Sequence, residues 1–418
     1  MTSVAGEAWF RDKGLERVLS LLNADGGEGR VVGGAVRNSL MGLPVADIDV
    51  ATTLLPEAVV ERAGAAGIKA VPTGIVHGTV TLVIDGKPFE ITTLRRDVET
   101  DGRRARVAFS DDWQADAERR DLTVNALYAS ADGEVVDLVG GLADLERRNI
   151  RFIGDAATRI AEDYLRILRF FRFFAYYGSG RPDADGLRAC AAARSKISTL
   201  SAERVWSEMK KLLAAADPGR ALLWMRQVGI LTEILPETEK WGIDAVPALI
   251  ATEQVLHWPA DPMLRLAAIV PPDAARLAKL AERLRLSKAE AAYLQAWANA
   301  PVVKDDMSEA AFDRLLYRHE PSGVATRLKL ALAVARGKAE SDFEEMSRSA
   351  RLGKLLDRIA AWKKPAFPIS GADALAAGIP AGPRIGELLG ILEQAWVDGN
   401  FKGDRASLLA RLKELANA

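Results

Sequence analysis

The stretch VVGGAVRNSLMGLPVADIDVAT, residues 31–52, decides the fold of the first third of the chain. A predicted short strand ends at Val32, and the Gly33-Gly34 pair lets the backbone turn sharply into a helix. Backbone N–H groups at such a turn point toward one position, which suits a phosphate. Arg37, one turn into the helix, adds a cation. The spacing fits neither GxxxxGK[ST] nor GxGxxG, so the P-loop and dinucleotide motifs are excluded.

A pair of aspartates follows this turn. Pro44 ends the helix, and the chain returns as a predicted strand containing Asp47, Ile48 and Asp49. Residues two apart on a strand share a face, so both carboxylates project together while Ile48 enters the core. Like charges repel unless a cation joins them, and Mg²⁺ binds carboxylates and substrate phosphates together. Alone, the acid pair is more often a solvated strand end, but its spacing from the glycine turn favours a site.

The composition limits the other functions. The chain has 418 residues with 56 basic and 57 acidic side chains, so any nucleic-acid partner must bind local patches. The single cysteine, Cys190, excludes internal disulfides and cysteine-rich zinc sites. The N-terminus lacks an apolar signal core, and no apolar run approaches the roughly 18 to 20 residues that span a bilayer. We therefore expect a cytoplasmic protein without membrane contact.

The pattern of the chain changes near residue 155. Before it, short β-branched runs such as GRVVGG and GTVTLVIDGKPFEITTLR alternate with helical stretches. After it, nearly every segment has apolar residues at helical spacing, with breaks at 178–186, 216–220 and 363–371. The fold class expected is an α+β head with a mixed sheet, followed by an all-α remainder.

The GG-x-x-R turn followed by DxD resembles the first motif of the nucleotidyltransferase superfamily that includes DNA polymerase β. Within it, the chain resembles the branch of class II CCA-adding tRNA nucleotidyltransferases and bacterial poly(A) polymerases. In that branch Asp47 and Asp49 match the metal ligands. Asn38 departs from the pattern, because aspartate usually follows the arginine, and we expect a modest consequence.

Three further segments extend the resemblance. The strand FEITTLR offers Glu90 as a third catalytic carboxylate, acting as a general base or metal ligand, although an ordinary edge-strand glutamate is the alternative. ERRDLTVNALY (118–128) resembles the second motif, in which Arg120 and Asp121 would hold the ribose; a solvated helix surface is the alternative. The charged segment between Arg95 and Arg119 is expected to be a mobile loop.

The segment EDYLRILRFFRFFAYYG, 162–178, predicts a buried helix because it is apolar nearly all round. Its buried guanidinium groups need anionic or acceptor partners. Asp163 and Arg166, three apart on a helix, would share a face. Aspartate only accepts hydrogen bonds and arginine only donates them. Cytosine and adenine present a donor beside an acceptor, whereas uracil and guanine reverse that order, so such a pair would accept C and A.

This segment matches the EDxxR motif of the family, in which the corresponding residues act as a protein template for CTP and ATP. Arg169 and Arg172 match arginines that contact the same nucleotide. The alternative for Asp163 is a helix cap with an ion pair to Arg166.

The resemblance implies a template-independent enzyme that adds CCA to the 3′ end of tRNA from CTP and ATP, using Mg²⁺ and releasing pyrophosphate. Gly33, Gly34 and Arg37 would hold the triphosphate, with no obligate protein partner. A partial enzyme adding only CC or only A, a poly(A) polymerase, and an inactive tRNA-binding protein are the alternatives. The expected regions are a helical leader (1–26), the catalytic head (27–158), a neck (159–220), an RNA-binding body (221–365) and a tail (366–418).

The remaining segments are expected to handle RNA. KISTLSAERVWSEMKKLL (196–213) resembles the fifth motif of the family, a neck helix, and residues 369–401 resemble its terminal segment. Basic side chains in the body could line a tRNA backbone, although each is more often part of a solvated face. These side chains are Arg327, Lys329, Arg336, Lys338, Arg351, Lys354, Lys363 and Lys364.

Overall fold

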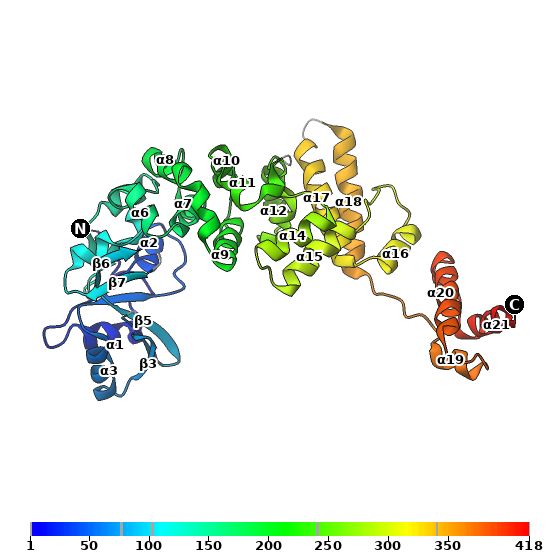
Figure 1. The fold of residues 1–418 in the computed structure, drawn as a ribbon, viewed down its shortest axis with the longest axis horizontal. Helices are drawn as coiled ribbons and strands as arrows, with labels where there is room; N and C mark the ends of the chain where they lie inside the picture. The colour runs from blue at the N-terminus through cyan, green and yellow to red at the C-terminus, as the bar shows by residue number, and fades with distance from the viewer. Residues whose placement is uncertain (1, 76–77, 102–103, 240–241, 340–341, 418) are drawn as a thin grey trace. The chain divides into compact units, whose positions relative to one another are not determined.

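The computed structural model describes residues 2–75, 78–101, 104–239, 242–339 and 342–417. It divides into two compact units, residues 1–236 and 237–418. The first unit contains a mixed sheet and helices, and the second is helical throughout the part that is described (Figure 1). The expected fold class is therefore confirmed. Helices within the described ranges are all too short or too polar to cross a membrane.

The first unit contains a seven-stranded sheet, with strand order β3-β4-β5-β2-β1-β8-β9 among the described residues. The strands β2 and β5 run parallel, and the other neighbouring pairs are antiparallel. The strand bounds are β1 Gly29–Val32, β2 Asp49–Thr52, β3 Lys69–Gly74, β4 Thr79–Ile84, β5 Lys87–Thr93, β8 Leu127–Ala129 and β9 Val135–Asp137.

Helices cover this sheet because its strands carry buried side chains, which in β4 alternate with partly exposed ones. α1 and α3 pack together against the strands, and α2 packs against β1 and β8 (Figure 1). α1 begins where the Asp12 carboxylate accepts the backbone N–H of Gly14 at 2.8 Å. The helix bounds are α1 Lys13–Leu22, α2 Gly34–Leu40, α3 Pro56–Ala65, α4 Trp113–Glu118, α5 Gly141–Glu146 and the 3-10 turn η2 Thr123–Asn125.

The segment after Arg95 is not the loop that the sequence predicted. It forms a two-stranded antiparallel hairpin of β6, Arg95–Asp101, and β7, Arg104–Phe109, and then α4. The strand period is weak in β6 because charged side chains occur at three successive positions, 95–97. Mobility of this segment stays a prediction, and residues 102 and 103 lie outside the described residues.

A layer of helices follows the sheet in the first unit. α7 is its central helix, and eight of its thirteen residues are buried. One of them, Phe170, stacks on Phe152 of the preceding segment with 5.3 Å between ring centres. The element bounds are α6 Ala156–Glu162, α7 Leu165–Tyr177, α8 Ala184–Ala192, η3 Arg194–Thr199, α9 Ala202–Leu213, α10 Gly219–Gln227, α11 Ile230–Ile234 and η4 Pro236–Thr238. The expected breaks at 178–186 and 216–220 begin after α7 and α9, as predicted, but each ends inside the first turn of the next helix, α8 and α10.

The described part of the second unit has two large hydrophobic cores and a smaller cluster that includes Leu249 and Leu264. One large core centres on α17 and α18, with Phe312 and Leu328 buried, and the other centres on Leu412 and Trp396 near the C-terminus. The helix bounds are α12 Ala245–Val255, α13 Pro262–Ile269, α14 Ala274–Arg283, α15 Lys288–Asn299, α16 Glu309–Arg318, α17 Pro321–Lys338, α18 Phe343–Ala361, α19 Gly371–Ala376, α20 Pro383–Asp398 and α21 Arg405–Asn417.

Candidate active site

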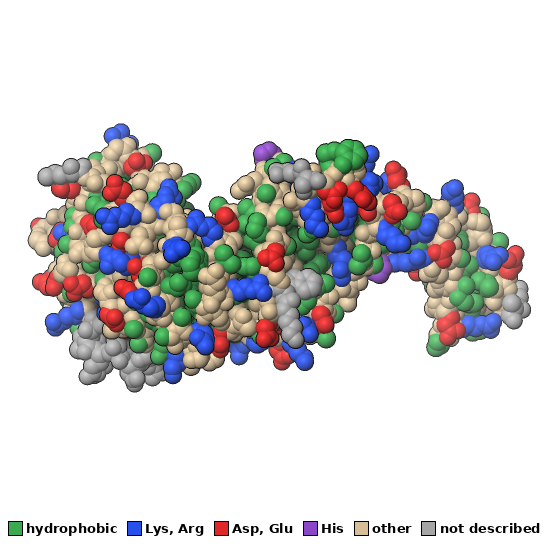
Figure 2. Space-filling model, turned by 90° about the horizontal axis from the view of Figure 1, so that it is seen from above, with side chains coloured by type: hydrophobic (Ala, Val, Ile, Leu, Met, Phe, Trp, Pro, Cys, Tyr) green, Lys and Arg blue, Asp and Glu red, His purple; other side chains and the backbone are tan. Residues whose placement is uncertain are grey.

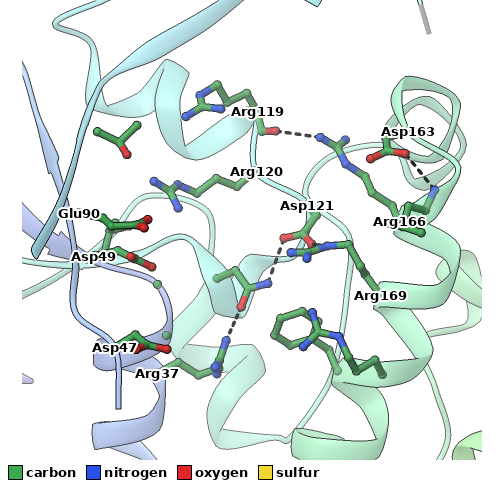
Figure 3. A pocket seen from close by; sticks show the side chains of 18 of the residues that line it. Arg37, Asp47, Asp49, Glu90, Arg119, Arg120, Asp121, Asp163, Arg166 and Arg169 are labelled. Atoms are coloured by element: carbon green, nitrogen blue, oxygen red, sulfur yellow. Dashed lines mark hydrogen bonds and ion pairs between the residues drawn. The ribbon is translucent and has the colours of Figure 1, made fainter. Parts of the chain in front are cut away.

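One cavity of about 820 Å³ in the first unit gathers all the residues that the sequence predicted for the site. The carboxylates of Asp47, Asp49 and Glu90 lie on one wall (Figure 3). The opposite wall comes from the helical layer, and Arg120 with Asp121 lies between the two walls (Figure 3). The predicted residues that line the cavity are Gly33, Gly34, Arg37, Asp47, Asp49, Glu90, Arg120, Asp121, Asp163, Arg166, Arg169 and Arg172.

The glycine turn joins β1 to α2 as expected. Gly33 has a φ of +73°, where a side chain would be strained, and a Cβ there would lie 3.4 Å from the Asn125 carbonyl oxygen. Its own N–H donates to the Leu127 carbonyl at 2.9 Å, which fixes the turn to the sheet. Gly33 and Gly34 line the cavity, and the first N–H groups of a helix have no partner within the helix, so a phosphate in the cavity could accept from them.

The acid pair differs from the predicted strand in one respect. β2 begins at Asp49, so Asp47 and Ile48 precede the strand rather than belong to it. Ile48 is half-buried and lines a surface hollow, so the prediction that it enters the core is wrong. The chain reaches the sheet only at Asp49, because Val32 of β1 pairs with Asp49 at the end of both strands. Both carboxylates still line the same cavity wall.

Glu90 lies beside Asp49 because β2 and β5 are parallel and place these two residues in register. β5 is an interior strand between β4 and β2, so the edge-strand alternative for Glu90 is wrong. Its neighbours Phe89 and Ile91 are buried, as expected, while Glu90 itself is exposed to the cavity. Burial and the nearby charge of Glu90 raise the pKa of Asp49, Arg120 opposes this, and Asp47 adds to it.

A raised pKa means that the surroundings destabilise the ionised carboxylate, and a bound cation would stabilise this ionised form. Within the described residues, no group of three or more Asp, Glu, His or Cys side chains is arranged to hold a metal ion by itself. Asp47 and Asp49 supply two of the oxygen ligands that a hard divalent cation prefers, and substrate phosphates commonly supply others. The donor set therefore fits a divalent ion shared with a phosphate.

Arg120 and Asp121 lie in the short connection after α4 rather than on a helix surface, so that alternative is wrong. Asp116, 1% exposed, accepts from Arg120 Nη2 at 3.0 Å and from the Tyr128 hydroxyl at 2.9 Å. Although burial alone would raise the pKa of Asp116, the charges of Arg120 and Arg119 bring it below its usual value. Asp116 therefore fixes the guanidinium of Arg120 near the acid pair.

Asp163 is not on the predicted continuous helix. α6 ends at Glu162, Asp163 is extended, and α7 begins at Leu165. The Asp163 carboxylate caps α7 by accepting the Leu165 N–H at 3.1 Å, and its other oxygen pairs with Arg204 Nη2 of α9 at 2.6 Å. The helix-cap alternative is thus confirmed, but the predicted ion pair of Asp163 with Arg166 is wrong.

Arg166 pairs instead with Glu162 and donates to two backbone carbonyls, of Arg159 at 3.0 Å and of Arg119 at 3.3 Å (Figure 3). One side of its guanidinium is held by these acceptors, and the residue still lines the cavity together with Asp163. The two residues therefore present an acceptor and a donor from adjacent positions, although no ion pair joins them.

Protein carboxylates satisfy the other two arginines of α7. Arg169 Nε donates to Asp121 Oδ2 at 2.7 Å, and Arg172 Nε donates to Glu208 Oε2 of α9 at 2.6 Å. Asp121 is 7% exposed, and although burial alone would raise its pKa, Arg169 and the hydrogen bond from Asn125 lower it. The requirement for anionic partners, expected from the apolar helix, is therefore met inside the protein.

Several residues of the site were not predicted. Asp116, Asn125, Tyr177, Arg204 and Glu208 hold the predicted side chains in place. Asn125 and Tyr177 lie inside quoted segments, so their polar groups next to buried arginines were available as a signal. Arg204 and Glu208 lie inside the quoted segment 196–213, but no local pattern links them to partners that are 41 and 36 residues away.

Comparisons with known proteins identify the family of this chain. A family model described as the poly A polymerase head domain matches residues 29–151, and one described as a probable RNA and SrmB-binding site of polymerase A matches residues 182–241. The mitochondrial CCA tRNA nucleotidyltransferase 1 of Mus musculus is 34% identical over 417 residues, which are 96% of this chain and 90% of the relative.

Bacterial relatives and a solved structure have the same extent. The CCA-adding enzyme of Geobacillus thermodenitrificans is 32% identical over 422 residues, covering 95% of both chains. The crystal structure of the Bacillus stearothermophilus CCA-adding enzyme in complex with CTP matches with a TM-score of 0.68 and 26% identity, covering 96% of both chains.

Proposed function

Because this chain belongs to the family of CCA-adding tRNA nucleotidyltransferases, we propose that it adds CCA to the 3′ end of tRNA from CTP and ATP. The reaction is template-independent nucleotidyl transfer that releases pyrophosphate. One observation carries the proposal: a single cavity has an acid pair and a glycine turn on one side and the acceptor and donor pair Asp163 and Arg166 on the other (Figure 3).

The acid wall serves the transfer step in this proposal. Asp47 and Asp49 hold Mg²⁺, which neutralises charge on the phosphates and lowers the pKa of the attacking hydroxyl when it is bound. Glu90, exposed beside Asp49 and outside any three-ligand group in the described residues, takes the proton from the terminal hydroxyl of the RNA. The backbone N–H groups after Gly33 and Gly34 donate to the phosphate oxygens and so seat the triphosphate at the turn.

The ribose and base occupy the rest of the cavity. Arg120 and Asp121 bond the ribose hydroxyls, which favours ribonucleotides. Asp163 keeps acceptor capacity on its carboxylate after bonding Leu165 and Arg204, since each oxygen has two lone pairs. Together with an N–H of Arg166 it pairs with the amino group and ring nitrogen of cytosine or adenine. Each good bidentate contact of this kind gives roughly 1 to 3 kcal/mol of discrimination.

The remaining expectations belong to the same proposal. In this proposal the head, neck, body and tail have the bounds predicted from the sequence. The protein acts in the cytoplasm, where its second unit contacts tRNA. On the face of that unit that Figure 2 shows, Lys and Arg side chains lie among Asp and Glu side chains. Arg351, for example, pairs with Asp305, and Lys364 lies 4.8 Å from the ring centre of Tyr317. Binding by many such dispersed contacts would be weakened by salt.

Incorporation of labelled CTP, ATP, UTP and GTP into tRNA lacking zero to three terminal nucleotides tests the function. The proposal expects CCA on tRNA lacking three nucleotides, a single A on tRNA ending in CC, and no use of UTP or GTP. Addition that stops after CC, or that occurs only on tRNA ending in CC, would identify a partial enzyme. A long A tract would identify a poly(A) polymerase, and no incorporation would leave only tRNA binding.

A further inference from the structure

A buried chain of hydrogen bonds crosses the floor of the cavity from the glycine turn to α7 (Figure 3). Arg37 of α2 donates to the Asn125 side-chain oxygen, and Asn125 Nδ2 donates to Asp121 Oδ1 at 3.0 Å. Asp121 Oδ2 then accepts from Arg169 Nε at 2.7 Å. Arg37, Asn125 and Asp121 are 6%, 9% and 7% exposed, so the hydrogen bonds that join them are sheltered from water.

The guanidinium of Arg37 has little capacity left for a ligand. An arginine has five N–H donors. Nε and one Nη2 hydrogen point to Asn38 Oδ1 at 3.2 and 2.9 Å, and the other Nη2 hydrogen points to the Tyr177 hydroxyl at 2.8 Å. One Nη1 hydrogen bonds Asn125, which leaves a single donor on Nη1. The group also lies 4.1 Å from the centre of the Tyr177 ring.

α7 contacts this network at two points, through Tyr177, which bonds Arg37, and through Arg169, which bonds Asp121. Tyr177 is the last residue of α7, and Arg169 lies eight residues before it. α7 also carries Arg166 and is capped by Asp163, the two residues proposed to read the base. The position of the base-reading pair is therefore tied to the glycine turn through Arg37 at one point and through Asp121 at another.

We infer that Arg37 is a positioning residue for base selection rather than the triphosphate ligand that the sequence predicted. It holds α7 at a fixed place relative to the turn, so that a nucleotide seated by its phosphates presents its base at hydrogen-bond distance from Asp163 and Arg166. Loss of one bond leaves a buried donor or acceptor without a partner, and α7 moves to satisfy it. This inference rests on the proposed function, because it assumes selection of CTP and ATP.

Tyr177→Phe and Asn125→Ala test the inference without changing a charge. Each variant is assayed with tRNA lacking CCA for the ratio of kcat/KM with CTP to kcat/KM with UTP, and for inhibition by tripolyphosphate. Each should lower the ratio about 5-fold, the loss of one hydrogen bond of ordinary strength, while tripolyphosphate inhibits within about twofold of the wild type. Arg37→Lys should lower the same ratio, and its effect should not add to that of Tyr177→Phe.

Tyr176→Phe is the matched control, because Tyr176 is the neighbouring tyrosine and its hydroxyl bonds the Lys211 carbonyl outside this chain of contacts. It should keep the wild-type ratio. The inference is overturned if Arg37→Lys weakens inhibition by tripolyphosphate about tenfold or more while Tyr177→Phe and Asn125→Ala keep the wild-type ratio. If the wild type incorporates neither CTP nor ATP, the proposed function itself fails, which is a separate outcome.

Discussion

Replacing Arg204 by alanine tests whether Asp163 must be held in place to read the base. Two contacts orient the Asp163 carboxylate: the Leu165 N–H at 3.1 Å and Arg204 Nη2 at 2.6 Å. Without Arg204, the carboxylate keeps only the contact to its own helix and can rotate about it. The proposed acceptor would then be misplaced for the amino group of cytosine in a fraction of encounters.

The size of the effect follows from the exposure of the pair. A hydrogen bond between charged groups contributes about 1.5 to 3 kcal/mol when it is well sheltered. The Arg204 and Asp163 side chains are 32% and 35% exposed, so solvent screening brings the figure to about 1 kcal/mol. That corresponds to about a 5-fold loss in kcat/KM for CTP. Discrimination against UTP should fall with it, because UTP gains nothing from a fixed acceptor.

Steady-state incorporation of CTP and UTP into tRNA lacking CCA measures both quantities. Arg204→Lys should recover part of the loss, since it restores the charge without the planar fork. Arg188→Ala is the control: it removes an arginine paired with Asp185 on α8 where both side chains are 76% exposed, and it should change neither value. An Arg204→Ala enzyme with unchanged or improved kcat/KM for CTP would refute the reasoning, because Arg204 would then compete with the base for Asp163.

Three other changes have defined outcomes. Burial and the charges of Glu90 and Asp47 raise the pKa of Asp49, so as the pH is lowered kcat/KM should begin to fall at a higher pH than an ordinary aspartate would give. Glu90→Gln should move this fall to lower pH and should also lower the rate on the plateau. A pH–rate profile in which the fall does not move would contradict the assignment. Arg265→Ala should lower the free energy of unfolding of the second unit by about 3 to 5 kcal/mol, measured with denaturant, because it leaves the buried Glu253 carboxylate without the bond from Arg265 Nη2 at 2.7 Å. Glu253→Gln should lower the free energy of unfolding by less. Equal losses in the two variants would argue against a charge effect. Asn38→Asp removes the hydrogen bond that Asn38 Nδ2 donates to the Pro44 carbonyl at 3.0 Å, but it keeps an acceptor for Arg37. The value of kcat/KM for CTP should therefore fall by about 5-fold or less. Loss of all activity would show that the amide is essential.

The sequence was sufficient for features that depend on neighbouring residues. The end of β1 at Val32, the turn at Gly33 and the early end of α2 follow from glycine conformation and a nearby proline. Glu90 was placed between two buried residues because a strand alternates its side chains. These local rules predicted the mixed sheet, whereas the family resemblance assigned the candidate residues to one site.

Features that depend on distant contacts were beyond local patterns. EDYLRIL has ordinary helix-forming residues, yet the chain is extended at Asp163, where Arg204 of α9 pairs with its carboxylate and Leu165 is capped. Tertiary contacts of this kind override intrinsic propensity. The hairpin of β6 and β7 was missed for another reason, because the Asp-Gly at 101–102 is a turn signal that the charged residues around it obscured.

The most direct test of the central claim is the rate of CTP addition by Asp49→Asn to tRNA lacking CCA at saturating Mg²⁺. The account predicts a loss of about 100-fold or more, because the amide removes one of two charged ligands at the point where charge develops. Asp85→Asn, an exposed aspartate at the turn between β4 and β5 of the same sheet, should keep the wild-type rate. A folded Asp49→Asn enzyme that adds CTP at the wild-type rate would contradict the account.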